Sequence, residues 1–293
     1  MALTIGLAVF VGISLGMLGG GGSILTVPLL AYVAGMDAKQ AIATSLLVVG
    51  VTSGVSAISH ARAGRVQWRT GLMFGGAAMA GAYGGGLLAR FIPGTVLLIG
   101  FAIMMIGTAV AMLRGRKNTE EVGGSGRGHH LPIPTIIAEG FVVGLATGLV
   151  GAGGGFLVVP ALVLLGGLPM PVAVGTSLIV IAMKSFAGLA GYLSSVQIDW
   201  AVALAVTTAA VAGALIGARL TGKVNPDTLR KAFGWAVLAM ASVILAQEVH
   251  LSFGIAVATV TAIAGVLTFA CSRYAHCPLH RPVGTTAAGP SPS

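Results

Sequence analysis

The chain has 293 residues, of which 56% are hydrophobic and only 8% are charged, and its mean hydropathy is +0.99. A water-soluble globule carries about 25% charged residues, so this composition excludes a soluble protein and predicts an integral membrane protein. The formal net charge is +9, but the basic residues lie in short segments between apolar runs, where they indicate the cytoplasmic side rather than a nucleic-acid site.

Apolar runs follow one another along almost the whole chain. Spanning β-strands are excluded, because they would be only about 10 residues long with alternating polarity. We expect an all-α integral membrane protein with about seven full transmembrane helices and two broken or re-entrant glycine-rich hairpins. The seven apolar runs are close to the roughly 20 residues that cross a bilayer, and they cover residues 41–59, 71–89, 96–113, 172–193, 200–220, 232–246 and 253–270.

The first glycine-rich segment, GMLGGGGSILTVPLL at residues 16–30, interrupts a strongly apolar stretch. Non-helical backbone at membrane depth is tolerated only where it is buried in protein or lines a cavity, and glycine allows a sharp turn there. A helix that restarts after the turn offers free N–H groups and a positive dipole end, which favours an anion. The candidate substrate-binding residues are therefore Gly19, Gly20, Gly21, Gly22 and Ser23. For Gly12 and Gly16, and for Gly144 and Gly148 later in the chain, each pair at a spacing of four, close helix packing is the favoured interpretation.

The same pattern returns in the second half of the chain, as GLATGLVGAGGGFLVVP at residues 144–160. Residues 12–53 share 16 identities in 42 positions with residues 144–185, including matched glycines, a proline and a Thr-Ser pair. This predicts an internal duplication. The expected organisation is a first repeat (1–113), a cytoplasmic linker (114–131), a second repeat (132–250), an additional C-terminal transmembrane helix (251–275) and a flexible tail (276–293).

The duplication adds candidate site residues in the second copy and in both hydroxyl pairs. Hydroxyls can donate to an oxyanion without adding charge, although they can equally bond to their own helix. The added candidates for substrate binding are Thr44, Ser45, Gly151, Gly153, Gly154, Gly155, Thr176 and Ser177.

Charge indicates that the two copies face opposite sides of the membrane. The loop after the second apolar segment carries three arginines in the first copy and no basic residue in the second. The loop after the third segment carries one arginine in the first copy and four basic residues in the second. Basic loops are cytoplasmic, so the copies are inverted, with the linker and the C-terminus inside. Each glycine-rich segment must then cross zero or two times. This favours a re-entrant hairpin, with a single broken crossing as the alternative.

Two charged residues within apolar segments are further candidates. Lys184 lies deep in the run SLIVIAMKSFAGLAGY, where a charge is costly and suggests a functional role, unless the side chain extends to the interface. Glu139 is a candidate for proton coupling, or else an acid near a helix start. No carboxylate pair, catalytic triad or metal cluster is present in the sequence, so we expect no enzyme, no cofactor and no metal.

The pattern G-x-x-x-G-x-x-G-x-G-G-G-x-x-x-x-P at residues 144–160, the following G-T-S, and the loop HARAGRVQW resemble the TauE/SafE (TSUP) family of sulfite exporters. The resemblance covers roughly residues 5–270. It implies a multi-pass permease of a prokaryotic inner (plasma) membrane, with two homologous halves, that moves sulfite, sulfonates such as sulfoacetate, or related sulfur oxyanions. Ser23 stands where the second copy has Gly155, and Lys184 matches no motif of the family.

We therefore predict a secondary transporter of a small anion, a sulfur oxyanion or organosulfonate, that works by alternating access between inverted repeats. The partners implied are the anionic solute and the lipid bilayer, with a homo-oligomer possible and no nucleic acid. Two alternatives stay open. One is an anion channel with two re-entrant loops, and the other is a membrane-embedded enzyme or its assembly partner.

Overall fold

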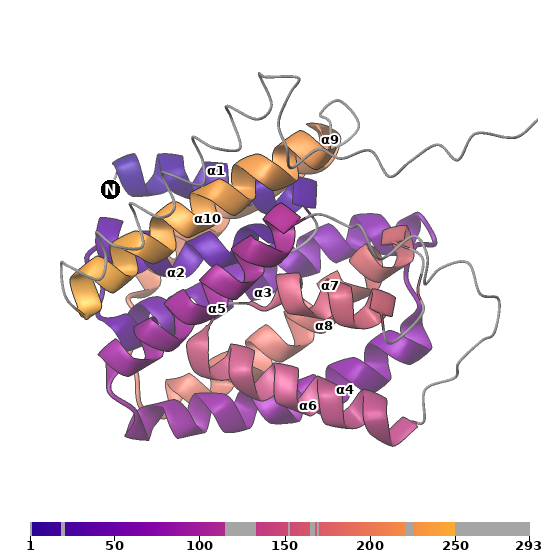
Figure 1. Cartoon of the computed structure of the whole chain (residues 1–293), viewed down its shortest axis with the longest axis horizontal. Coiled ribbons are helices and arrows are strands. Elements are labelled where there is room, and N and C mark those ends of the chain that lie inside the picture. Colours follow the sequence, from indigo (N-terminus) through magenta and orange to yellow (C-terminus); the bar gives the residue numbers. More distant parts are fainter. Residues whose placement is uncertain are drawn as a thin grey trace, which may run out of the picture.

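The computed structural model describes residues 2–18, 21–114, 133–151, 153–164, 168, 170–220 and 226–249. Within these ranges the chain is helical and contains no strand (Figure 1). The first half comprises α1 (Ala2–Leu18), η1 (Gly21–Leu25), α2 (Thr26–Pro28), η2 (Leu29–Val33), α3 (Ala38–Arg62), α4 (Trp68–Leu88), η3 (Ala89–Phe91) and α5 (Gly94–Arg114). The second comprises α6 (Ile133–Val150), α7 (Gly155–Leu164), α8 (Met170–Leu193), α9 (Trp200–Leu220) and α10 (Pro226–Glu248).

Four helical segments are long and apolar enough to cross a membrane: Ala38–Arg62, Trp68–Phe91, Val172–Leu193 and Trp200–Arg219. Shorter apolar helices are found at Leu3–Gly16, Gly22–Val33, Gly94–Val110, Thr135–Val150 and Gly234–Glu248. The predicted all-helical class is confirmed, and the apolar helices fit a membrane protein. The predicted linker, C-terminal helix and tail lie outside the described residues, apart from Arg114.

α1 packs on α9, and α6 packs on α4, with backbone against backbone through glycine. A Cβ on Gly12 would overlap the carbonyl oxygen of Ala210, and a Cβ on Gly144 would overlap that of Ala78. Both contacts recur one turn later, with Gly16 against Ala214 and Gly148 against Ala82. The predicted packing role of these glycines is confirmed, because only glycine allows so close an approach.

α3 and α8 cross in the middle of the molecule. Gly50 of α3 lies beside the ring of Phe186, and Gly54 lies beside Ala182 of α8. α3 is also covered by α9, α5, α2 and η2, so Ile42, Leu46 and Val49 are almost fully buried. α5 and α10, magenta and orange in Figure 1, pack on each other along one side of this core.

Candidate functional site

The helix break in the second half occurs at the predicted glycines. We call the described residues Gly151, Gly153 and Gly154 the second elbow. Their φ angles are +71°, +57° and +61°, a left-handed region that glycine adopts readily and other residues rarely do. α6 ends before the elbow, where the N–H of Gly151 donates to Thr147 O at 2.9 Å. α7 begins after it at Gly155, with the N–H groups of Leu157 and Val158 both 3.0 Å from Gly154 O.

The first elbow, which we define as the described residues Gly21, Gly22 and Ser23, has a different shape. These residues open the 3₁₀ helix η1, and the chain continues through one turn of α-helix into the π-helix η2. A Cβ on Gly22 would overlap the backbone of Leu15, so the chain folds back closely on α1. Gly19 and Gly20 lie outside the described residues. Of the two breaks, only the second therefore leads into a regular α-helical N-terminus.

The two elbows touch. A Cβ built on Gly153 would lie 3.0 Å from both Cβ and Oγ of Ser23, and it would overlap Val49 of α3. Ser23 is fully buried. Segments from opposite halves of the sequence thus meet in the interior, beside the centre of α3.

The first Thr-Ser pair lies against the second elbow. Ser45 Oγ donates to Gly151 O at 3.1 Å. Ile42, one turn earlier on α3, packs so closely on Gly151 that a Cβ there would overlap its side chain. The hydroxyl of Thr44 is buried and has no hydrogen-bond partner among the described residues. α3 therefore fixes the second elbow through a side chain-to-backbone hydrogen bond.

The second Thr-Ser pair has other partners. The backbone N–H of Gln67, just before α4, donates to Thr176 Oγ1 at 3.0 Å, and the methyl group of Thr176 faces Gly71. Ser177 Oγ donates to Val174 O of its own helix at 2.8 Å, which is the local bonding that Ser commonly makes in apolar helices. The two pairs thus match in sequence but differ in their contacts.

Lys184 is buried next to the second elbow. Its side chain is only 2% exposed, so it does not extend to the surface. Nζ donates to Thr147 Oγ1 at 2.6 Å, and it fills the space that a Cβ on Gly154 would occupy. Within the described ranges no carboxylate pairs with this ammonium group. An ammonium group and the N-terminus of α7 therefore converge at Gly154 without an acidic counter-charge.

Thr147 is a further candidate site residue, and no sequence motif singles it out. Its hydroxyl receives the Lys184 hydrogen bond and donates in turn to Val143 O at 2.7 Å. Its equivalent in the first copy is Leu15, and the equivalent of Lys184 is Thr52. Comparing the two copies position by position could have found it, because the changes from Leu15 to Thr147 and from Thr52 to Lys184 both add a more polar side chain to the second half.

Other buried hydroxyls lie near the middle of α3 and α8 without a hydrogen-bond partner in the described part of the chain. Ser53 and Ser185 occupy equivalent positions of the two helices, and each has an unpaired Oγ. A buried, unpaired hydroxyl costs free energy. These groups are consistent with an interior that accepts a polar solute.

Glu139 lies away from this cluster. It is half-buried on α6, eight residues before Thr147, which on a helix corresponds to about 12 Å. The neighbouring Gly140 packs against the backbone of Phe74 on α4. Among the described residues, no group of His, Cys, Asp and Glu side chains could hold a metal ion.

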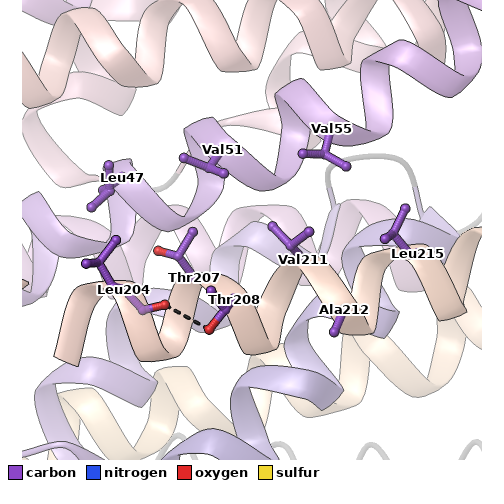
Figure 2. A pocket seen from close by; sticks show the side chains of 9 residues that line it. All are labelled: Leu47, Val51, Val55, Leu204, Thr207, Thr208, Val211, Ala212 and Leu215. Carbon is purple, nitrogen blue, oxygen red and sulfur yellow. Dashed lines mark hydrogen bonds between the residues drawn. The ribbon is translucent and has the colours of Figure 1, made fainter. Parts of the chain in front are cut away.

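A cavity of about 520 Å³ lies elsewhere, between α3 and α9 (Figure 2). Its only polar side chains are Thr207 and Thr208, whose hydroxyls donate to carbonyl oxygens of their own helix at 2.6 to 3.0 Å. It therefore offers an anion no free donor. We call it the α3–α9 groove, and its lining residues are Leu47, Val51, Val55, Leu204, Thr207, Thr208, Val211, Ala212 and Leu215.

The chain is similar over most of its length to a known protein family. The family model described as "Sulfite exporter TauE/SafE" matches residues 4–244. A "Probable membrane transporter protein" of Xylella fastidiosa (strain Temecula1 / ATCC 700964) is 33% identical over 248 residues, covering 82% of this chain and 93% of that protein. The "Probable membrane transporter protein YunE" of Bacillus subtilis (strain 168) is 29% identical, covering 73% of this chain and 85% of its own length.

A more distant relative is archaeal. The "Probable membrane transporter protein MJ0441" of Methanocaldococcus jannaschii is 28% identical over 255 residues, covering 78% of this chain and 90% of its own length. No solved structure matches the chain.

Proposed function

Because the chain belongs to the sulfite exporter TauE/SafE family of membrane transporters, we propose that it is a secondary transporter of a small anion that works by alternating access. The observation that carries this proposal is the convergence of Lys184, Thr147 and the N-terminus of α7 at Gly154, in the buried interior and without an acidic partner among the described residues. A buried cation of this kind is costly by itself. A bound anion would offset the cost.

The proposed architecture is a pair of inverted repeats. It is supported by contacts that recur when the second half is aligned on the first. Gly12 approaches Ala210 as Gly144 approaches Ala78. At the crossing of α3 and α8, the contacts of Gly50 with Phe186 and of Gly54 with Ala182 are equivalent in the same way. In transporters built this way, the substrate lies near the midplane between discontinuous helices. We place the elbows, which touch at Ser23 and Gly153, at this position.

The proposed site is unequal in its two halves. The second repeat supplies a helix N-terminus at Gly155 and the ammonium group of Lys184. The first supplies the hydroxyl of Ser23 and the α3 hydroxyls that have no partner among the described residues, those of Thr44 and Ser53. The side chains of Thr176 and Ser177 are directed to other partners, so we place them outside the direct contacts to the anion. Glu139 is assigned no contact to the anion, and a role in proton coupling would have to act at a distance.

The proposed substrate is a sulfur oxyanion or organosulfonate. Its oxygens would accept hydrogen bonds from the ammonium group, from backbone N–H groups and from hydroxyls, all of which are donors. The proposed setting is the inner membrane of a prokaryote, with the segment after α5 and the C-terminus on the cytoplasmic side. The basic segments at Arg62–Arg69 and Arg219–Lys231 support this orientation.

A thermal-shift measurement on the purified protein tests this site. Sulfite, sulfate, thiosulfate, sulfoacetate and taurine are added separately, and a ligand that binds the folded state raises the unfolding temperature. Lys184→Met should remove at least one charge-assisted hydrogen bond, which weakens binding by about tenfold to a hundredfold. The same change should raise the stability of the protein without anion, because it removes an unpaired buried charge.

Thr52→Met serves as the matched control, because Thr52 is the equivalent position in the first half and its hydroxyl bonds to Val48 O of its own helix. It should leave anion binding nearly unchanged. If a bound anion is found and Lys184→Met does not weaken it, the site is misplaced. Saturable flux with counterflow in proteoliposomes would support a transporter, whereas unitary conductance would indicate an anion channel.

A further inference from the structure

Two equivalent helix interfaces of this protein are packed to different degrees. When Gly12 is aligned on Gly144, α4 corresponds to α9 and α8 corresponds to α3, so the α4–α8 and α9–α3 interfaces are counterparts. The contrast between them has a basis in the sequence, because α4 carries glycine at positions where α9 carries larger side chains. Gly71, Gly75 and Gly86 correspond to Ala203, Thr207 and Ala218.

At the α4–α8 interface the two backbones are in close contact. A Cβ on Gly86 would lie 2.6 Å from the carbonyl oxygen of Gly188, and a Cβ on Gly191 would lie 2.7 Å from that of Tyr83. Nearer the start of α4, Gly75 accommodates the thioether of Met183, with a Cβ-to-Sδ separation of 3.1 Å. This interface is closed along most of its length.

At the counterpart interface, the α3–α9 groove separates the helices. Val51 stands where α8 has Met183, and Thr207 stands where α4 has Gly75, so the shorter side chain of α3 faces a bulkier α9 across the groove. Figure 2 shows Val55 and Val211 directed toward each other from opposite sides. The outer residues Leu204 and Leu215 are 57% and 51% exposed.

α9 is attached more firmly to α1 than to α3. Gly213 and Gly217 of α9 lie against the carbonyl oxygens of Val9 and Ile13 of α1, and Gly12 of α1 lies against Ala210. These contacts leave no space even for a methyl group, so α1 and α9 form one rigid unit. Packed helix pairs of this kind move as bodies, whereas loosely packed interfaces allow them to shift.

We propose that α1 and α9 move together relative to α3, and that closure of the α3–α9 groove is the conformational change that switches the transporter between its two states. This inference rests on the proposed function. In the alternate state the two interfaces exchange roles, so the groove closes while the α4–α8 interface loosens. One state then has the α4–α8 interface closed and the groove open, the other state has the reverse, and the two states are in equilibrium.

Cysteine pairs test the proposal. In a parent with Cys271→Ser and Cys277→Ser, the double change Val55→Cys with Val211→Cys places thiols across the groove. The matched control, Met79→Cys with Ala187→Cys, places them at the equivalent positions of α4 and α8. A disulfide requires the α-carbons to come within about 7 Å, so disulfide formation reports closure. Copper-phenanthroline oxidises both variants in proteoliposomes, before any anion is added.

We expect the control pair to oxidise readily, because that interface is already closed. The Val55/Val211 pair should oxidise more slowly but to completion, as the groove closes transiently. Its disulfide should then abolish the flux of radiolabelled sulfate or sulfoacetate, and reduction should restore it. The proposal is overturned if both groove thiols react with a maleimide but never form the disulfide, or if the disulfide forms and flux continues.

A second variant approaches the same question without cross-linking. Ala212→Phe fills the groove from α9 and should lower flux about tenfold by preventing closure, while anion binding persists. Ile216→Phe, on the same helix but outside the groove lining, is the control and should transport normally. Equal flux in both would contradict the proposal. If the parent moves none of the tested anions, the proposed function fails, whereas the disulfide measurement still decides whether the groove closes.

Discussion

The two glycine elbows have closely related sequences, but only one of them forms the sharper break. The second elbow has three glycines with positive φ and leads directly into the regular helix α7. The described part of the first elbow continues as 3₁₀, α and π turns, with no positive φ among its described residues. Ser23 replaces a glycine there, and its side chain faces Gly153. One elbow thus provides the backbone terminus and the other provides a hydroxyl beside it.

The same inequality extends to the neighbouring polar residues. Lys184 and Thr147 belong to the second half, and their first-half equivalents are Thr52 and Leu15. The glycine contacts of α1 with α9 and of α6 with α4, by contrast, are equivalent in the two halves. These scaffold contacts are therefore shared between the copies, whereas the chemistry of the interior has diverged. Three further mutational tests probe this difference between the two halves.

The largest effect is expected for Gly154→Ala. The residue would keep a left-handed φ, at a cost of about 1–3 kcal/mol, and its Cβ would displace Lys184 Nζ and Thr147, adding about 1–3 kcal/mol of overpacking. Gly64→Ala is the matched control, because Gly64 has φ +67° but open space around it. It should cost only about 1–2 kcal/mol. Denaturant unfolding in detergent measures both, and equal losses would argue against a crowded second elbow.

An intermediate effect is expected for Gly12→Ala and Gly144→Ala. Each added methyl group would overlap a carbonyl oxygen of the facing helix, so each variant should lose about 1–3 kcal/mol of stability, and the two losses should be similar. Gly6→Ala and Gly76→Ala, which have nothing within 4 Å, should be neutral or slightly stabilising because Ala favours a helix. A large difference between Gly12→Ala and Gly144→Ala would contradict equivalent packing.

The smallest effect is expected for the two serines of the Thr-Ser pairs. Ser45→Ala removes the hydrogen bond to Gly151 O and should cost about 1–2 kcal/mol, since a buried carbonyl loses a partner. Ser177→Ala removes only a bond to its own helix and should change stability by less than about 0.5 kcal/mol. Thermal unfolding of the two variants measures the difference. Equal losses would mean that the pairs play the same role.

The sequence predicted a large part of this molecule before any coordinates. The all-helical class follows from the length of the apolar runs, and the break before α7 was predicted from consecutive glycines that a continuous membrane helix does not need. The packing role of Gly12 and Gly16, and of Gly144 and Gly148, was predicted from the spacing of four within each pair. Phe253–Ala270, predicted as a further crossing, lies outside the described residues.

Other features could not be read from the chain. Thr147 was missed because a single threonine in an apolar helix is ordinary, and only the fold brings it to 2.6 Å from Lys184 Nζ. The Thr-Ser pairs were expected to act alike, since they match in sequence, yet their neighbours come from different helices. The α3–α9 groove could be located only once the spacing of two helices was known.

The amino-acid sequence alone indicates which segments are helical, where the backbone breaks and which positions permit close helix contact. These features depend on local properties such as chain flexibility, side-chain size and hydropathy. The packing of the whole chain was needed to show which break meets which helix, where the ammonium group of Lys184 lies and which of two related interfaces is closed. Those outcomes depend on contacts between residues that are far apart along the chain. Such contacts are set by how the helices fit together as a whole.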